Sequence, residues 1–217
     1  MGARRRRKDL LGRKAFLECR TLLALLAAAA IAAPACRSGR PPLPQKRRNL
    51  VLVLIDTLRR DHLPSYGYPR PTAPFLARLA AQGSIADGVS PTSWTKPAVA
   101  TVLTGLHPLR HQTFGNLDVL PEEALTLAEM LKAHGYQTLG VTANGFVGSH
   151  YGFSQGFDLY FTLPEQGLGR FEPASSVNRI VETRLPPLRP PFFLYVHYLD
   201  PHAPYETMSA ITALDLL

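Results

Sequence analysis

Residues 49–55, Asn-Leu-Val-Leu-Val-Leu-Ile, constrain the fold more than any other stretch of the chain. The run is aliphatic at successive positions, so a strand built from it is apolar on both faces and needs cover on both. Residues 136–142 and 192–198 predict two further strands, while helices are predicted over 73–81, 97–103 and 122–133. This alternation indicates an α/β sandwich around a mainly parallel sheet, with functional residues at the carboxyl ends of the strands.

The first 36 residues have the three zones of an export signal: a basic stretch over 4–20, an apolar run over 22–33 and small residues before Cys36. The apolar run is shorter than the roughly 20 residues that a membrane span needs. Cys36 stands where a lipoprotein signal places its acylated cysteine. Lipid attachment at Cys36, cleavage after Ala35 and retention as an uncleaved anchor are the alternatives.

Residues 37–48 contain three prolines and five Lys or Arg residues, a composition typical of a polar tether. The predicted organisation is therefore a signal over 1–36, a tether over 37–48 and a folded domain over 49–217. The only cysteines are Cys19 and Cys36, so the domain has no disulfide and no thiolate chemistry. We expect an exported protein on the periplasmic or extracellular face, attached to the membrane.

The net charge of +8 comes from the leader and not from the domain. Residues 1–50 carry 13 Lys and Arg against 2 acidic residues, whereas residues 51–217 carry 11 against 14. Nucleic-acid binding would need a basic surface with interleaved aromatic residues, and no such cluster follows Arg48. The charge distribution therefore predicts no nucleic-acid partner, while the leader predicts contact with a membrane.

Polar residues follow the predicted strands where a site is expected. Asp56 comes directly after the first strand, and Asp200 and His202 come after the third. A carboxylate at such a position binds a divalent cation or caps the next turn. Thr95 lies just before an apolar helix whose early Pro97 marks its amino end, where free amides favour an anion. Thr95 is therefore a candidate nucleophile and equally a candidate helix cap.

Four segments, residues 52–68, 74–83, 93–111 and 197–205, resemble the amino-terminal half of the sulfatase family within the alkaline-phosphatase superfamily. The signature of that family is Cys or Ser, x, Pro, Ser, Arg, x, x, two aliphatic residues and Thr-Gly. It falls on residues 95–105, where Pro97 and the final Thr104-Gly105 are kept. The resemblance implies an alkaline-phosphatase-like α/β fold and a metal-dependent hydrolase of sulfate, phosphate or phosphonate esters.

The resemblance also assigns roles to individual residues. Thr95 occupies the position of the formylglycine precursor, but its extra methyl group prevents formation of the aldehyde, so no formylglycine is expected. By analogy with superfamily members that use an unmodified threonine, Thr95 would attack directly. Asp56 would bind a divalent ion such as Ca, Zn or Mn, Lys96 would hold an oxygen of the transferred group, and His202 would contact that group or protonate the leaving oxygen.

Other parts of the family pattern are missing. One aspartate replaces the usual adjacent pair, because Thr57 follows Asp56, and the Lys-x-His pair expected after residue 142 is replaced by Ala-Asn-Gly-Phe. The resemblance ends near Tyr205, before the further metal ligands that the family supplies from its second half. We therefore expect a truncated catalytic domain. The alternatives are a phosphoryl or phosphoglycerol-type transferase acting on a lipid or glycan acceptor, and an inert membrane-tethered fragment.

Overall fold

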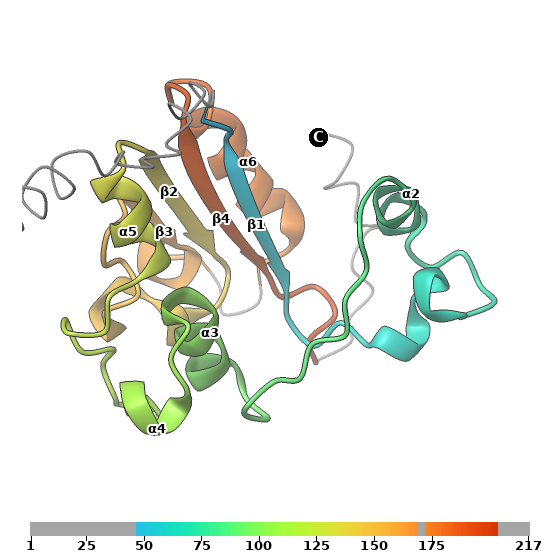
Figure 1. The fold of residues 1–217 in the computed structure, drawn as a ribbon, viewed down its shortest axis with the longest axis horizontal. Helices are drawn as coiled ribbons and strands as arrows, with labels where there is room; N and C mark the ends of the chain where they lie inside the picture. Colours follow the sequence, from blue (N-terminus) through green and yellow to red (C-terminus); the bar gives the residue numbers. More distant parts are fainter. Residues whose placement is uncertain (1–46, 169–171, 204–217) are drawn as a thin grey trace, which may run out of the picture. The chain divides into compact units, whose positions relative to one another are not determined.

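The computed structural model describes residues 47–168 and 172–203. Its centre is a four-stranded, fully parallel sheet in the order β1-β4-β2-β3, shown in Figure 1. The strands are β1 (Leu50–Ile55), β2 (Gln137–Thr142), β3 (Leu159–Thr162) and β4 (Phe192–Tyr198). The predicted signal, tether and Cys36 lie almost wholly outside the described residues.

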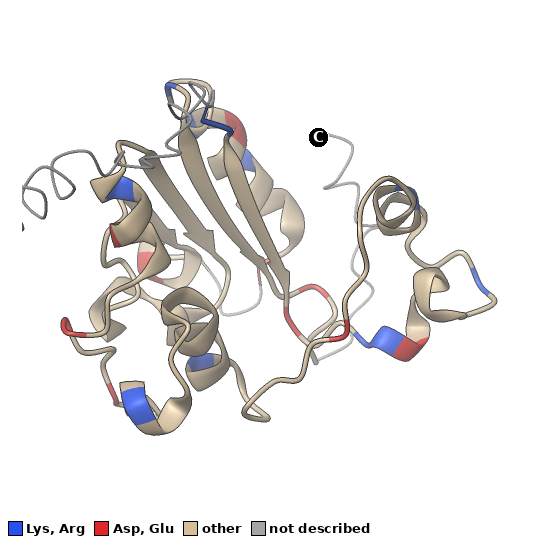
Figure 2. Ribbon diagram, viewed as in Figure 1, with Lys and Arg blue, Asp and Glu red and all other residues tan. Residues whose placement is uncertain are grey.

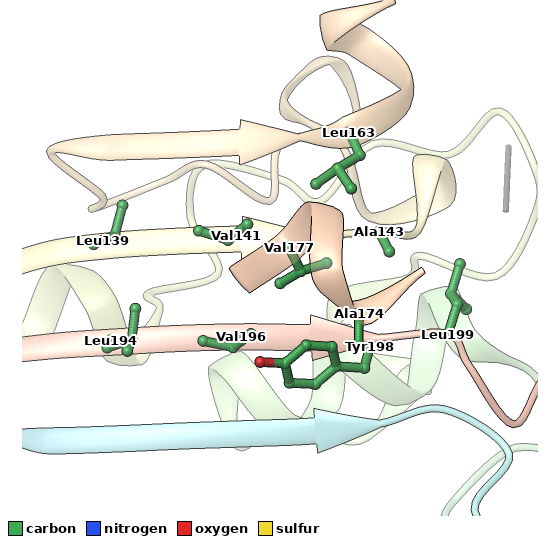
Figure 3. Packing of buried hydrophobic residues seen from close by; sticks show 10 residues of the cluster. All are labelled: Leu139, Val141, Ala143, Leu163, Ala174, Val177, Leu194, Val196, Tyr198 and Leu199. Atoms are coloured by element: carbon green, nitrogen blue, oxygen red, sulfur yellow. The ribbon is translucent and has the colours of Figure 1, made fainter. Parts of the chain in front are cut away.

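Helices cover both faces of this sheet. The side chains of α6 (Ala174–Arg184) pack on one face in a cluster that includes Val177, Val141 and Val196, as Figure 3 shows. On the other face, α3 (Thr95–Thr104) and α5 (Leu127–Ala133) contribute side chains to a second cluster. Burying apolar area on both faces at about 25 cal/mol per Å² stabilises this layered arrangement.

Strand β4 shows how the sequence divides its side chains between the two clusters. Leu194 and Val196 belong to the cluster under α6, whereas Phe193 and Tyr195 belong to the cluster under α3 and α5. Because successive side chains of a strand point to opposite faces, His197 follows Phe193 and Tyr195 onto the α3 side. This alternation places a buried histidine beneath the amino end of α3.

The remaining elements connect these layers. They are the helices α2 (Pro74–Gln82) and α4 (Pro108–His111) and five short 3₁₀ helices: η1 (Arg60–His62), η2 (Pro64–Tyr66), η3 (Gly145–Val147), η4 (Ser149–Tyr151) and η5 (Leu163–Gln166). Helix α2 has no buried residue and contacts η2. Within the described residues, no helix has the length and apolar character needed to cross a membrane.

The predicted α/β fold with its parallel sheet is confirmed, and the three predicted strands correspond to β1, β2 and β4. The helix predicted over 122–133 is shorter than expected. It begins after Thr126, because Thr126 and Glu129 form a reciprocal capping box that fixes its first turn. The N-cap of α2 is Ala73.

Charged residues are scattered over separate elements of the described ribbon, as Figure 2 shows. Acidic and basic residues pair locally, for example Arg59 with Asp61 and Lys132 with Asp158. The described part of the chain therefore has no basic stripe of the kind that follows a phosphate backbone.

Candidate active site

The candidate site lies where the carboxyl ends of three strands approach the amino end of α3. Asp56 follows β1, Asn144 follows β2 after one intervening residue, and His197 is the penultimate residue of β4. The backbone amide of Asp56 donates to the carbonyl of Tyr198 at 3.0 Å, which continues the β1–β4 ladder to the edge of the site. Parallel pairing thus brings together side chains that lie up to 141 positions apart in the sequence.

Two donors and a histidine nitrogen lie around one oxygen of the buried Asp56 carboxylate. The hydroxyl of Thr95 donates to Oδ2 at 2.8 Å, and Nδ2 of Asn144 donates to the same atom at 3.3 Å. Nε2 of His197 lies 3.4 Å from it. Burial alone would raise the pKa of Asp56, but the His197 and Thr95 donors outweigh burial and hold that pKa below its ordinary value. Asp56 is therefore an anion at neutral pH.

Thr95 is the first residue of α3 and does not cap it. The N-cap is Trp94, in extended backbone conformation and without a side-chain capping bond. The prediction of Thr95 as a helix cap is wrong in this respect, because its hydroxyl is directed to Asp56 instead. Its position still combines the two features expected of an anion site, a hydroxyl and the amino end of a ten-residue helix.

Lys96 does not occupy the place predicted for it. Its side chain is fully buried, and Nζ donates to the carbonyls of Gly115, Asn116 and Asp118 at 3.3, 2.8 and 2.7 Å. The ammonium also lies 3.3 Å from the centre of the Tyr151 ring. The described geometry therefore gives Lys96 a structural contact with a loop and an aromatic wall, and not a contact with a transferred group.

A cavity of about 560 Å³ opens beside Thr95 and Asp56. Its aromatic walls include Trp94 and Phe146, whose rings meet edge to face at 5.9 Å, and Tyr151. The full lining consists of Asp56, Thr57, Ser90, Thr92, Ser93, Trp94, Thr95, Ala98, Asn144, Gly145, Phe146, His150, Tyr151, Pro164, Leu199 and His202. Such a cavity has room for a ring-sized group next to the Thr95 hydroxyl.

His202 lines this cavity, as the prediction of a substrate contact requires. Its backbone amide donates to the carbonyl of Leu199 at 2.8 Å, which turns the chain back towards the site after β4. Asp200, predicted at the same sheet edge, has another role. Its Oδ1 accepts from the amide of Ala174 at 2.9 Å and so binds the amino end of α6.

The described residues supply few ligands for the expected divalent ion. Asp56 and Thr95 offer one carboxylate and one hydroxyl, whereas such ions usually take at least about three or four protein ligands. Within residues 47–168 and 172–203, no group of three or more His, Cys, Asp or Glu residues could hold a metal ion. The described part alone does not fit a complete divalent site.

Two residues of the site were not identified from the sequence. For the segment that contains Asn144, the sequence indicates only that the family's Lys-x-His pair is absent. For His197, the sequence predicts only that the residue lies in a strand. The position of Asn144 just beyond a buried strand was a usable signal, since Asp56 was found by that rule. The direction of the His197 side chain could not be predicted in the same way, because it depends on which face of the sheet α3 covers.

Comparison with known proteins shows the family to which the chain belongs. The family model described as Sulfatase matches residues 48–211. Arylsulfatase A of Homo sapiens is 35% identical over 185 residues, covering 77% of this chain and 34% of that protein. The chain thus spans about a third of the length of this curated relative.

Two solved structures show the same fold. The C-terminal periplasmic domain of EcEptC from Escherichia coli, in complex with Zn, matches with a TM-score of 0.56 and 24% identity, over 76% of this chain and 47% of that chain. The phosphonate monoester hydrolase of Agrobacterium radiobacter matches with a TM-score of 0.56 and 19% identity, over 72% of this chain and 41% of that chain.

The fold and the site define an alkaline-phosphatase-like α/β protein with a threonine at the start of a helix beside a strand-end aspartate. The match of the family model over most of the chain makes the relationship specific: the chain belongs to the sulfatase family.

Proposed function

We propose that residues 49–217 form the amino-terminal part of a metal-dependent ester hydrolase in which the Thr95 hydroxyl is the nucleophile. The observation that carries this proposal is the 2.8 Å hydrogen bond from Thr95 Oγ1 to Asp56 Oδ2 at the edge of the cavity. The bond directs the hydroxyl proton of Thr95 towards Asp56 and leaves the lone pairs of the Thr95 oxygen available to a substrate in the cavity.

In the proposed reaction, Thr95 Oγ1 forms a bond to the sulfur or phosphorus atom of the ester, and the bond from that atom to the leaving oxygen breaks. The Thr95 proton passes along its hydrogen bond to Asp56 and on to water. His202, at the cavity wall, supplies a proton to the leaving alcohol. Water then cleaves the threonine ester and restores the hydroxyl.

The side chain of Thr95 favours phosphorus over sulfur in this scheme. A formylglycine hydrate has a second hydroxyl whose oxygen can expel sulfate, whereas threonine has a single hydroxyl and depends on attack by water. The superfamily members that attack with an unmodified threonine, which this chain resembles at Thr95, are phosphodiesterases and phosphoglycerol transferases. Overall similarity to arylsulfatase A favours sulfate esters instead, so both classes belong in the assay.

Asp56 would provide one ligand for a Ca, Zn or Mn ion, with the remaining ligands supplied from outside the described residues. The ion would stabilise negative charge on the transferred group. The Zn complex among the matched structures supports a cation in this fold. The leader would carry the domain to the periplasmic or extracellular face and attach it through Cys36 or the apolar run.

The test uses the purified chain with an aryl sulfate, an aryl phosphate diester and an aryl phosphonate monoester, each with added Zn, Mn or Ca. We expect release of the phenol, with a mass increase on the peptide that contains Thr95 after rapid quenching. Thr95→Ala should abolish both signals, while Thr95→Ser should retain them. Product formed only with an added acceptor alcohol would indicate a transferase, and no metal uptake with no turnover would contradict the proposal.

A further inference from the structure

His197 is a fully buried histidine that lies between a tyrosine and the site carboxylate. One ring nitrogen, Nδ1, lies 3.1 Å from the hydroxyl of Tyr195 and 3.3 Å from Oγ1 of Thr142. The other, Nε2, lies 3.4 Å from Oδ2 of Asp56 and makes no hydrogen bond within the described residues. Both nitrogens of this ring are thus directed at defined groups.

The neighbour on the Nδ1 side determines which nitrogen carries the proton. Tyr195 is completely buried, and burial together with the nearby charge of Asp56 raises the pKa of its hydroxyl far above the ordinary value. The hydroxyl therefore keeps its proton and can donate it to Nδ1 of His197. A neutral imidazole that accepts a hydrogen bond at Nδ1 carries its proton on Nε2.

The Nε2 proton matters because of the group that it faces. Asp56 is a buried carboxylate, and a buried charge without donors is costly. Asn144 and His197 approach the same oxygen that receives the Thr95 hydroxyl. His197 from β4 and Asn144 from the loop after β2 therefore restrict the rotation of the Asp56 carboxylate. Thr95, the third residue at this oxygen, lines the cavity.

We propose that His197, held as the Nε2-protonated tautomer by the Tyr195 hydroxyl, is a positioning residue that orients Asp56 towards Thr95. The consequence for turnover rests on the proposed function, but the tautomer and its contacts do not. Tyr195, His197, Asp56 and Thr95 then form one relay of polar contacts from the core to the cavity. The relay explains the buried hydroxyl of Tyr195 in an otherwise apolar cluster.

The first experiment reads the tautomer directly and needs no activity. Nitrogen NMR of the chain labelled with ¹⁵N-histidine, at neutral pH, distinguishes protonated from unprotonated ring nitrogens for the seven histidines. His197→Gln assigns the signals of His197 by their loss. We expect Nε2 protonated and Nδ1 unprotonated, and a change of the Nδ1 signal in Tyr195→Phe, which keeps the ring. A proton on Nδ1, or on both nitrogens, would overturn the inference.

The second experiment separates positioning from packing. Gln at position 197 can present an amide donor near the place of Nε2, whereas Leu cannot. We expect His197→Leu to lower kcat about 100-fold with little change in KM, since small displacements of reacting groups have effects of this size. His197→Gln should recover a large part of that loss, and the exposed His134→Gln is the matched control. Equal losses in the Leu and Gln variants would contradict the role.

These two experiments keep the inference separate from the proposed function. If the wild-type chain shows no turnover with any ester, the proposed function fails, while the NMR result still decides the tautomer. If the wild-type chain is active and Leu at position 197 prevents folding, Tyr195→Phe becomes the kinetic variant. An unchanged kcat together with an unchanged Nδ1 signal in Tyr195→Phe would then refute the inference.

Discussion

Replacement of Lys96 by methionine tests the structural role that the model assigns to this buried cation. Lys96→Met keeps most of the apolar stem and removes the ammonium, which donates to three carbonyls and lies over the Tyr151 ring. A hydrogen bond to a charged group contributes about 1.5–3 kcal/mol. Part of the stabilisation from these hydrogen bonds is offset by the free-energy cost of burying the ammonium. The same burial lowers the pKa of Lys96.

We expect a net loss of about 3 kcal/mol, since the carbonyls of the exposed residues Gly115 and Asn116 can regain water. At about 2–4 °C per kcal/mol for a domain of this size, the melting temperature should fall by about 6–12 °C. The assay is thermal and urea unfolding followed by circular dichroism. Lys132→Met, which removes one half-exposed ion pair with Asp158, is the matched control and should cost under about 1 kcal/mol. Equal losses in the two variants would refute the reasoning.

Three further changes test other parts of the structure. Because the pKa of Asp56 is lowered in the folded state, the ionised carboxylate stabilises the fold fully above about pH 3.9, and this stability is lost as the pH falls through the folded-state pKa. The difference in unfolding free energy between wild type and Asp56→Asn should therefore disappear in acid. Urea unfolding midpoints measured across pH would show this. Gly140→Ala should destabilise by about 1–3 kcal/mol in urea unfolding, since the new Cβ would meet Cε2 of Tyr160 at 2.6 Å, whereas Gly83→Ala, with its nearest neighbour at 3.4 Å, should be tolerated. Thr126→Ala breaks the capping box of α5 and should cost about 1 kcal/mol, and an unchanged melting temperature would contradict that assignment.

The central layers of the fold could be predicted because their signals are local. A strand that is apolar at every position, such as 50–55, needs cover on both faces wherever it occurs. Strand β3 (Leu159–Thr162) and helix α6 were not predicted. The four residues of β3 are too few to show a period, and α6 carries Ser, Asn, Arg and Glu among its apolar positions.

The site was predictable only as far as sequence position determines side-chain direction. Asp56, Thr95 and His202 were predicted, and the structure brings Thr95 to Asp56 and places all three at one cavity. Lys96 was predicted to bind the transferred group because it follows Thr95 in the sequence. Adjacent residues of a helix point about 100° apart, however, so the side chain of Lys96 faces the core. To predict the role of His197, one would need the register of β4 and the position of α3. Both are features of the tertiary structure and cannot be read from the local sequence.

Strand β1 carries Asp56 and pairs, within the described residues, with β4 alone. No described strand pairs with its outer edge, where Leu50 and Val51 are 41% and 44% exposed. Such an edge is a template for another strand. Unless a further strand protects it, the purified chain should self-associate in proportion to its concentration, and a lysine at position 51 should suppress that association. The same strand that delivers the carboxylate to the site would thus also control how the purified chain associates.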